Sequence, residues 1–250
     1  MQAAIETIGL TRTFGQFTAV DKLDLSVPPG TFFGFLGPNG AGKSTTIKML
    51  TGLIRISAGK ARILGADVDG DPIEVKKQIG VVPEELALFD RLTGSEYLRF
   101  VGRMYGLQKN TIGSRSAELL ELMSLHDDSR KLIVDYSHGM KKKLSLAAAL
   151  IHDPKVLFLD EPFEGIDAIA SREIKDLMHA MVDRGVTIFL TSHILEIVEK
   201  LCSEVAIIHQ GRLVAEGSTR ELGGGAGLEE TFLGLVGNQD APKATLSWLG

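Results

Sequence analysis

The sequence contains little cysteine, no long hydrophobic run and no excess of basic residues. Its one cysteine, Cys202, excludes an internal disulfide, and a reducing cytoplasm is the compartment expected for such a chain. The longest apolar stretches, at 144–151 and 156–159, are far shorter than the ~18–20 residues that a membrane-spanning helix needs. The first six residues carry no basic region and no long apolar core, so we expect no secretory signal peptide.

Charge and composition are those of an ordinary globular protein, with one exception. The formal charge of −5 gives no support for nucleic acid as a partner, because phosphate binding usually leaves a basic excess. With 44% hydrophobic and 24% charged residues, the chain has enough apolar side chains for a sizeable core. Glycine is the exception, since 28 glycines in 250 residues exceed the usual ~7%. This surplus predicts a local use for glycine, such as a tight loop.

Short apolar runs alternate with helical patterns over much of the chain. This alternation predicts an α/β fold around a parallel sheet. The expected strands are 31–36, 79–82, 156–159, 186–190 and 205–208, and the expected helices between them are 43–50, 170–182 and 194–201. Residues 5–8, 23–27 and 61–64 also have strand character.

The pattern changes between the strand at 79–82 and the strand at 156–159. Strand signals are rare there, and helical segments are expected at 94–105, 114–123 and 139–151. We therefore expect a helical insertion at about 84–153. A glycine-rich joint at 223–227 is followed by a short helix candidate, 228–236, and by a loose tail.

Residues 37–45 match the phosphate-loop pattern G-x-x-x-x-G-K-[ST] in full, between an expected strand and an expected helix. The glycines let backbone N–H groups converge on phosphates, and the helix adds positive potential at its N-terminus. Lys43 brings a charge to the β- and γ-phosphates, and the Ser44 hydroxyl is suited to Mg²⁺. The expected nucleotide-binding residues are therefore Gly37, Pro38, Asn39, Gly40, Ala41, Gly42, Lys43, Ser44 and Thr45.

Two acidic residues follow the apolar run at 156–159. This strand would deliver Asp160 and Glu161 to the carboxyl edge of the sheet, where open α/β sheets bind their ligands. We expect Asp160 to hold Mg²⁺ and Glu161 to act as general base on the attacking water.

Ser137 and Gly139 stand about twenty residues earlier, at the head of an expected helix, where a serine cap alone would account for Ser137.

Taken together, these segments resemble the nucleotide-binding subunit of an ATP-binding cassette (ABC) transporter over roughly residues 4–220. Residues 37–45 and 157–161 are similar to the Walker A and Walker B motifs, and 136–140 stand where the family has its signature L-S-G-G-Q. The resemblance implies further site residues: His193 as the switch histidine, Asp167 in the D-loop, and an adenine-stacking aromatic at Phe14 with Val20 nearby.

The resemblance also implies a fold and a domain organisation. The expected fold class is α/β, with a P-loop NTPase (RecA-like) parallel sheet core, an N-terminal antiparallel β subdomain and an inserted helical subdomain. Residues 1–220 would form the nucleotide-binding domain, and 221–250 a C-terminal helix and tail.

The chain departs from the family pattern at two places. The signature keeps Ser137 and Gly139 but has His138 and Met140 in place of glycine and glutamine. Glu84 follows Pro83 where the family has its Q-loop glutamine. Both departures resemble bacterial exporters whose ATPase is a separate chain. Glu84 is expected to contact the nucleotide and Mg²⁺, or else to face a membrane partner.

The resemblance implies an ATPase that binds ATP and Mg²⁺ and drives an exporter from the cytoplasmic face of the cell membrane. Its expected partners are a second nucleotide-binding subunit, in a head-to-tail homodimer, and separate transmembrane permease subunits, with no nucleic acid. The helical segment expected after Glu84, with Leu86, Leu88, Phe89 and Leu92, is a candidate permease contact or part of the core.

Two other functional classes fit parts of the pattern. A soluble ABC ATPase of a non-membrane assembly complex has the same motifs, and its mark would be recovery without a span-containing partner. A P-loop GTPase or kinase would leave Ser137, Gly139 and His193 without a role. The three lysines at 141–143 are interpreted as a solvated face, with a role for Lys143 in ordering the signature region as the alternative.

Overall fold

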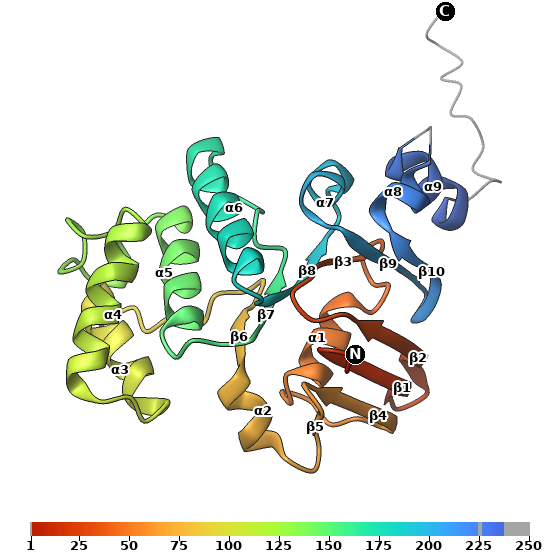
Figure 1. Ribbon diagram of the computed structural model, residues 1–250, viewed down its shortest axis with the longest axis horizontal. Coiled ribbons are helices and arrows are strands. Elements are labelled where there is room, and N and C mark those ends of the chain that lie inside the picture. Colours follow the sequence, from red (N-terminus) through yellow and green to blue (C-terminus); the bar gives the residue numbers. More distant parts are fainter. Residues whose placement is uncertain (1, 225–226, 238–250) are drawn as a thin grey trace, which may run out of the picture.

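The computed structural model describes residues 2–224 and 227–237, and its centre is a six-stranded sheet (Figure 1). The strand order is β10-β9-β3-β8-β7-β6, and all neighbours are parallel except β10 and β9. Every residue of β3, β7 and β8 is buried, which is why each strand has an uninterrupted apolar centre. The strands are β3 (Phe32–Leu36), β6 (Ile79–Val82), β7 (Val156–Asp160), β8 (Thr187–Ser192), β9 (Glu204–His209) and β10 (Arg212–Ser218).

A second, antiparallel sheet lies beside the first and has the order β2-β1-β4-β5. Its long hairpin pairs Phe14 with Phe17 at the turn and Ile5 with Val27 at the far end. Its strands are β1 (Ile5–Phe14), β2 (Phe17–Val27), β4 (Ala58–Ile63) and β5 (Ala66–Asp67).

The helices form an inserted block, a set around the central sheet, and a pair after β10 (Figure 1). A helical block is inserted in the chain between β6 and β7, which pair as neighbours in the sheet, and its first helix begins with a Thr93–Glu96 capping box. The block contains α3 (Gly94–Met104), α4 (Lys109–Leu122), the 3₁₀ turn η1 (Ile133–Asp135) and α5 (His138–Leu150). The remaining helices are α1 (Lys43–Leu50), α2 (Pro72–Gln78), α6 (Ala168–Asp183) and α7 (Leu195–Leu201), with α8 (Thr219–Gly223) and α9 (Leu228–Val236) beyond β10.

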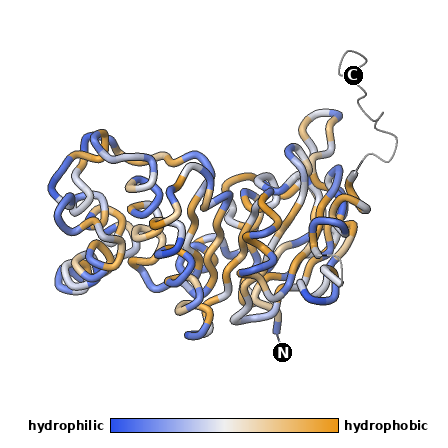
Figure 2. The backbone as a smooth tube through the Cα atoms, turned by 90° about the horizontal axis from the view of Figure 1, so that it is seen from above, coloured by the Kyte–Doolittle hydropathy of each residue, from blue (hydrophilic) through white to orange (hydrophobic). Residues whose placement is uncertain are grey.

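Hydrophobic side chains cover both faces of the central sheet, and Figure 2 shows the apolar colour gathered along its strands. One face carries Phe33, Phe35, Phe158 and Phe189, whose neighbouring rings lie 5.3–5.6 Å apart, against α1 and the antiparallel sheet. The other face packs on α5, α6, α7 and the helical block. This two-sided packing fixes the carboxyl edge of the sheet, where the phosphate loop lies.

The predicted α/β fold, with its antiparallel subdomain and inserted helices, is confirmed. The expected strands and helices are present except for the helical segment expected directly after Glu84, and β1 and β2 extend well beyond the apolar ends that the sequence pattern marked. The division at residue 220 stays a prediction, and the tail beyond 237 lies outside the described residues. None of the helices in the described part of the chain combines the length and apolar character that crossing a bilayer requires.

One local expectation was wrong. The segment 83–93 is not helical, because α3 begins only at Gly94. In that loop Leu86, Leu88 and Leu92 are partly buried against the core, whereas Phe89 is about half exposed.

Candidate functional site

The phosphate loop lies between β3 and α1, at the edge where the parallel strands β3, β7 and β8 end. A cavity of about 540 Å³ opens there. It collects side chains from segments far apart in the sequence, as the carboxyl edge of an open α/β sheet does. The cavity is lined by Phe17, Ala19, Pro38, Asn39, Gly40, Ala41, Gly42, Lys43, Ser44, Thr45, Glu84, Glu161, Glu164 and His193.

The loop backbone accepts only glycine at two of its positions. Gly42 has a φ of 109°, and a Cβ there would lie 2.6 Å from the carbonyl oxygen of Ala19. A Cβ on Gly37 would lie 2.4 Å from the carbonyl oxygen of Ile208. These close approaches bring the loop N–H groups and the N-terminus of α1 to one side of the cavity, which is a cradle suited to phosphate.

Lys43 is the buried cation of this cavity. Its side chain is 7% exposed, and its Nζ donates a hydrogen bond of 2.7 Å to the carbonyl oxygen of Gly37. The same Nζ lies 3.7 Å from Oε1 of Glu161. The phosphate loop and the acidic end of β7 therefore meet at Lys43.

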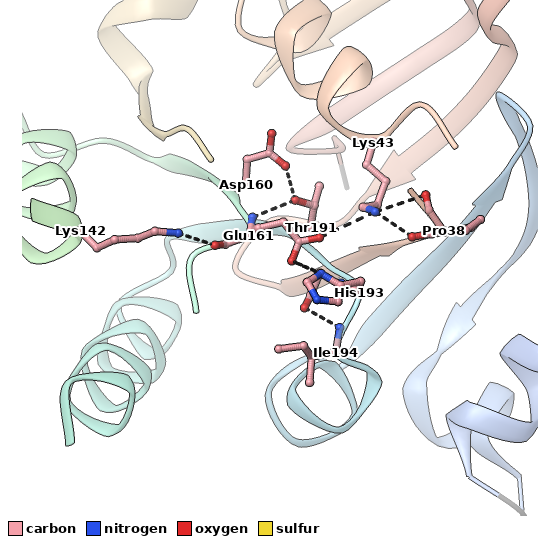
Figure 3. A network of polar contacts seen from close by, with 10 residues as sticks. Pro38, Lys43, Lys142, Asp160, Glu161, Thr191, His193 and Ile194 are labelled. Carbon is pink, nitrogen blue, oxygen red and sulfur yellow. Dashed lines mark hydrogen bonds and ion pairs between the residues drawn. The ribbon is translucent and has the colours of Figure 1, made fainter. Parts of the chain in front are cut away.

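The Glu161 carboxylate lies between Lys43, the first residue of α1, and His193, which follows β8 (Figure 3). Its Oε2 lies 3.0 Å from Nδ1 of His193 and accepts a bond of 3.3 Å from the backbone N–H of the same residue. The Glu161 side chain is 8% exposed, whereas that of His193 is 48% exposed. Glu161 is thus a buried carboxylate at the wall of the cavity, with a half-exposed imidazole beside it.

Asp160 lies behind Glu161 and is bonded to a residue that the sequence analysis gave no role. The Thr191 hydroxyl donates to Oδ1 of Asp160 and accepts a bond of 3.2 Å from the backbone N–H of Glu161. Thr191 is fully buried and Asp160 is 4% exposed. The register of β7 and β8 pairs Asp160 with Thr191, so strand pairing is the signal that points to this contact.

The interpretation of residues 141–143 as a solvated face was wrong for two of the three lysines. Lys142 is 3% exposed, and its Nζ donates a bond of 2.6 Å to the backbone carbonyl of Glu161. The Nζ of Lys143 lies 2.5 Å from Oε2 of Glu173 on α6. Only Lys141 stays near the surface, where it lies 3.4 Å from Asp90. The helical repeat of α5 turns Lys142 toward the sheet, which composition alone does not indicate.

The signature residues meet the D-loop, and they do not line the cavity. Ser137 caps α5, its hydroxyl accepting a bond of 3.2 Å from the backbone N–H of Met140. Asp167 caps α6, and its bonds from Ala170 and Ile169 N–H groups lower the pKa of its carboxyl. A Cβ on Gly139 would lie 3.9 Å from Oδ2 of Asp167. These three residues therefore form a second group in the same chain, and Ser137 and Asp167 are exposed.

The residues near the expected adenine site are arranged differently from the sequence expectation. Phe14 is 47% exposed and lies under Arg12, whose guanidinium carbon is 4.4 Å from the ring centroid. Phe17, across the hairpin turn from Phe14, lines the cavity together with Ala19. Val20 is fully buried, and its methyl group would lie 3.2 Å from a Cβ on Gly42, so it packs beneath the loop.

The oxygen atoms near the cavity are of the kind that Mg²⁺ prefers, namely hydroxyl and carboxylate. Ser44 and Glu84 line the cavity, and Asp160 lies behind it. Within residues 2–224 and 227–237, no group of three or more His, Cys, Asp or Glu side chains is arranged to hold a metal alone. A magnesium ion at this edge would therefore share its coordination with phosphate and water, and the residues present fit that arrangement.

The ABC transporter family matches residues 20–164, a segment that includes the phosphate loop, Ser137, Asp160 and Glu161. The chain belongs to the ABC transporter family. It is an ATP-binding, ATP-hydrolysing subunit, because relatives that match most of it are named as ATP-binding proteins and a similar solved chain is the ATP-binding subunit of an ABC transporter.

Two relatives and one solved structure illustrate the similarity. The daunorubicin/doxorubicin resistance ATP-binding protein DrrA of Streptomyces peucetius is 42% identical, over 96% of this chain and 73% of its own length. The bacitracin transport ATP-binding protein BcrA of Bacillus licheniformis is 40% identical, over 86% of this chain and 70% of its own. A solved ATP-binding subunit of an ABC transporter superimposes with a TM-score of 0.87 at 30% identity, covering 93% of this chain and 99% of that chain.

Proposed function

We propose that this ABC ATPase drives an exporter of drug-like or antibiotic-like compounds through separate membrane subunits. Support comes from relatives named for daunorubicin, linearmycin and bacitracin, all of them ATP-binding proteins of resistance or transport systems. The observation that carries the ATPase chemistry is the convergence of Lys43, Glu161 and His193 on one cavity that the phosphate loop lines.

Hydrolysis follows from the positions of these side chains. The loop N–H groups and Lys43 bind the β- and γ-phosphates of ATP, and His193 holds the carboxylate of Glu161 toward the γ-phosphate. Glu161 accepts the proton of a water molecule whose oxygen bonds to the γ-phosphorus, while the bond from that phosphorus to the bridging oxygen of ADP breaks.

Ser44, Asp160 and Glu84 are the proposed residues around Mg²⁺. The ion, when bound, supplies positive charge to the β- and γ-phosphate oxygens. Thr191 keeps Asp160 oriented through its hydroxyl. Glu84 brings a carboxylate where the family has a neutral amide, so its charge favours the site with the metal present.

A second copy of this chain is the proposed source of the missing half of the site. Ser137 and Gly139 lie outside the cavity, and Ser137 is exposed at the N-terminus of α5. A head-to-tail dimer would bring this helix N-terminus of one copy to the γ-phosphate held by the other, and a homodimer is the proposed form. ATP would then hold the two copies together, and hydrolysis would release them.

The proposed permease contact is a groove beside the helical block. The groove has a volume of about 190 Å³ and an apolar lining that includes Val81, Leu88, Tyr97, Val101 and Tyr105. Phe89 and Phe100 pack edge to face beside it, 5.3 Å apart, and both are exposed. Phe89 follows Glu84 by only a few residues in the same loop, which would let movement at the nucleotide reach a membrane subunit from the cytoplasmic face of the membrane.

Glu161→Gln tests the proposed dimer. The substitution keeps the shape of the side chain but removes the base, so ATP should bind without being hydrolysed and the dimer should persist. We expect size-exclusion chromatography with ATP and Mg²⁺ to give twice the monomer mass. Glu164→Gln is the matched control, because it removes the same charge from the same cavity and should elute as a monomer. A Glu161→Gln protein that binds ATP and stays monomeric would contradict the proposal.

A further inference from the structure

Lys142 is a buried lysine that the proposed hydrolysis does not use. It lies on α5, five positions after Ser137, and 3% of its surface is exposed. Lysine is almost never this deeply buried unless it has a specific partner. Its side chain shares a small space of about 10 Å³ with Val82, Leu146, Leu159, Pro162, Ile174 and Met178.

The partner of Lys142 is the main chain of Glu161. Its Nζ donates a bond of 2.6 Å to the Glu161 carbonyl oxygen (Figure 3). The same oxygen accepts a longer bond of 3.3 Å from the Glu164 N–H. Burial lowers the pKa of the Lys142 amine, and the carboxylates of Glu164, Glu161, Glu84 and Asp160 oppose that shift. These four acids offset part of the cost of burying the charged amine.

The backbone of Glu161 has the conformation that such a partner stabilises. Its φ of 47° lies in the left-handed region, which residues other than glycine rarely adopt. Strained residues of this kind persist only where the surrounding structure holds them. Here the Thr191 hydroxyl accepts a hydrogen bond from the N–H of Glu161, and Nζ of Lys142 donates one to the carbonyl of Glu161.

We propose that Lys142 is a positioning residue for Glu161, holding its peptide so that the carboxylate points to Lys43 and His193. This inference rests on the proposed role of Glu161 as general base. It also joins two parts of the mechanism, because Lys142 and Ser137 share helix α5. The helix that would meet the partner copy's ATP therefore carries the side chain that orients the base of its own copy.

Lys142→Met is the central test, since methionine keeps the length and apolar stem of lysine but removes its N–H donors. We expect kcat for ATP hydrolysis to fall by roughly tenfold to a hundredfold, as misplacement of a catalytic group does, with KM for ATP nearly unchanged. The thermal midpoint should fall somewhat, because the buried Glu161 carbonyl loses its donor, so all variants are assayed well below their midpoints. Lys142→Arg, which keeps a charged donor, should retain more activity than Lys142→Met.

The control is Lys141→Met, which removes the neighbouring charge from the same helix near the surface and should hydrolyse ATP at the wild-type rate. An unchanged kcat in Lys142→Met would overturn the inference. So would a fall of kcat that Lys142→Arg does not recover when all variants are assayed well below their thermal midpoints. If Lys142→Met does not fold, Lys142→Gln against Lys142→Arg makes the same comparison. Failure of the proposed function is recognised separately, because Glu161→Gln would then turn over ATP at the wild-type rate.

Discussion

The structure allows an estimate of the stability that would be lost with the Thr191 hydroxyl. Thr191→Val keeps the shape of this fully buried side chain and removes only its oxygen. Oδ1 of Asp160 then loses its donor, and the Glu161 N–H keeps only its bond of 3.3 Å to the Thr191 carbonyl. The substitution therefore leaves a buried carboxylate without one of its hydrogen bonds, at the edge where ATP is hydrolysed.

The expected cost follows from the charge and burial of Asp160. A hydrogen bond to a charged group contributes about 1.5–3 kcal/mol, and a buried acceptor left unpaired loses at least as much. We therefore expect Thr191→Val to lower the free energy of unfolding by about 2–3 kcal/mol. For a chain of this size each kcal/mol shifts Tm by about 2–4 °C, so Tm should fall by about 4–12 °C.

Thr191→Ser is the matched control, since it keeps the hydroxyl and removes one methyl group at a cost of about 1 kcal/mol. Urea unfolding of the three proteins, followed by circular dichroism, gives both differences, and steady-state ATPase assays should place Thr191→Ser above Thr191→Val. A Thr191→Val protein as stable as Thr191→Ser would refute the reasoning, because the hydroxyl would then contribute nothing beyond its volume.

Two further predictions concern Glu84 and His152. Glu84→Gln should still hydrolyse ATP but need roughly fivefold more Mg²⁺ for half-maximal rate, because an exposed charge contact is worth up to about 1 kcal/mol. Identical magnesium titrations of variant and wild type would leave Glu84 as a coupling residue. Burial lowers the pKa of His152 below its ordinary value of 6.5, so the unfolded chain binds a proton there that the folded chain binds only at lower pH. The free energy of unfolding should therefore fall as pH drops below about 6.5. His152→Phe keeps the stack on Tyr105 and should show a smaller drop in Tm than wild type between about pH 7.5 and pH 5.5. Equal drops in Tm would exclude this role for His152.

Local patterns in the sequence predicted the parts of the site that depend on consecutive residues. The phosphate loop needs its glycines and Lys43 at fixed spacing, and the two acids must follow a buried strand directly. Both requirements involve residues that are adjacent in the sequence, so the sequence alone could assign Lys43 and Glu161 to a nucleotide site. The role of His193 came from the family resemblance, and its side chain lies beside Glu161 because β8 neighbours β7 and ends at the same edge.

Other parts of the site depend on packing between distant segments. Thr191 gains its role only through its register with Asp160, and Lys142 only through the rotation of α5 against the sheet. Phe17 lines the cavity because the hairpin turn brings it there, although the family resemblance pointed to Phe14. In each case the contact depends on how distant segments pack against each other, which the local sequence pattern does not show.

The elements that the sequence analysis missed are those with weak apolar patterns. α2 buries one residue, Val75, so its helical periodicity is not visible. β10 is an edge strand whose seven residues are all at least partly exposed, and its sequence RLVAEGS has only three consecutive apolar residues followed by Glu-Gly-Ser, so it gives a weak strand signal. Such elements form because neighbours offer them backbone partners, and not because of strong local preference.

The central claim is that the site is completed by a second copy of the chain, and subunit mixing tests it most directly. A Lys43→Ala chain lacks a working phosphate loop, and a Ser137→Arg chain lacks a working signature. A head-to-tail dimer of the two has one fully intact site, and random pairing makes about half of all dimers mixed, so the mixture should recover about a quarter of the wild-type ATPase rate. Differently tagged chains establish that mixed dimers have formed. A mixture that contains mixed dimers but hydrolyses ATP no faster than either variant alone would contradict the account.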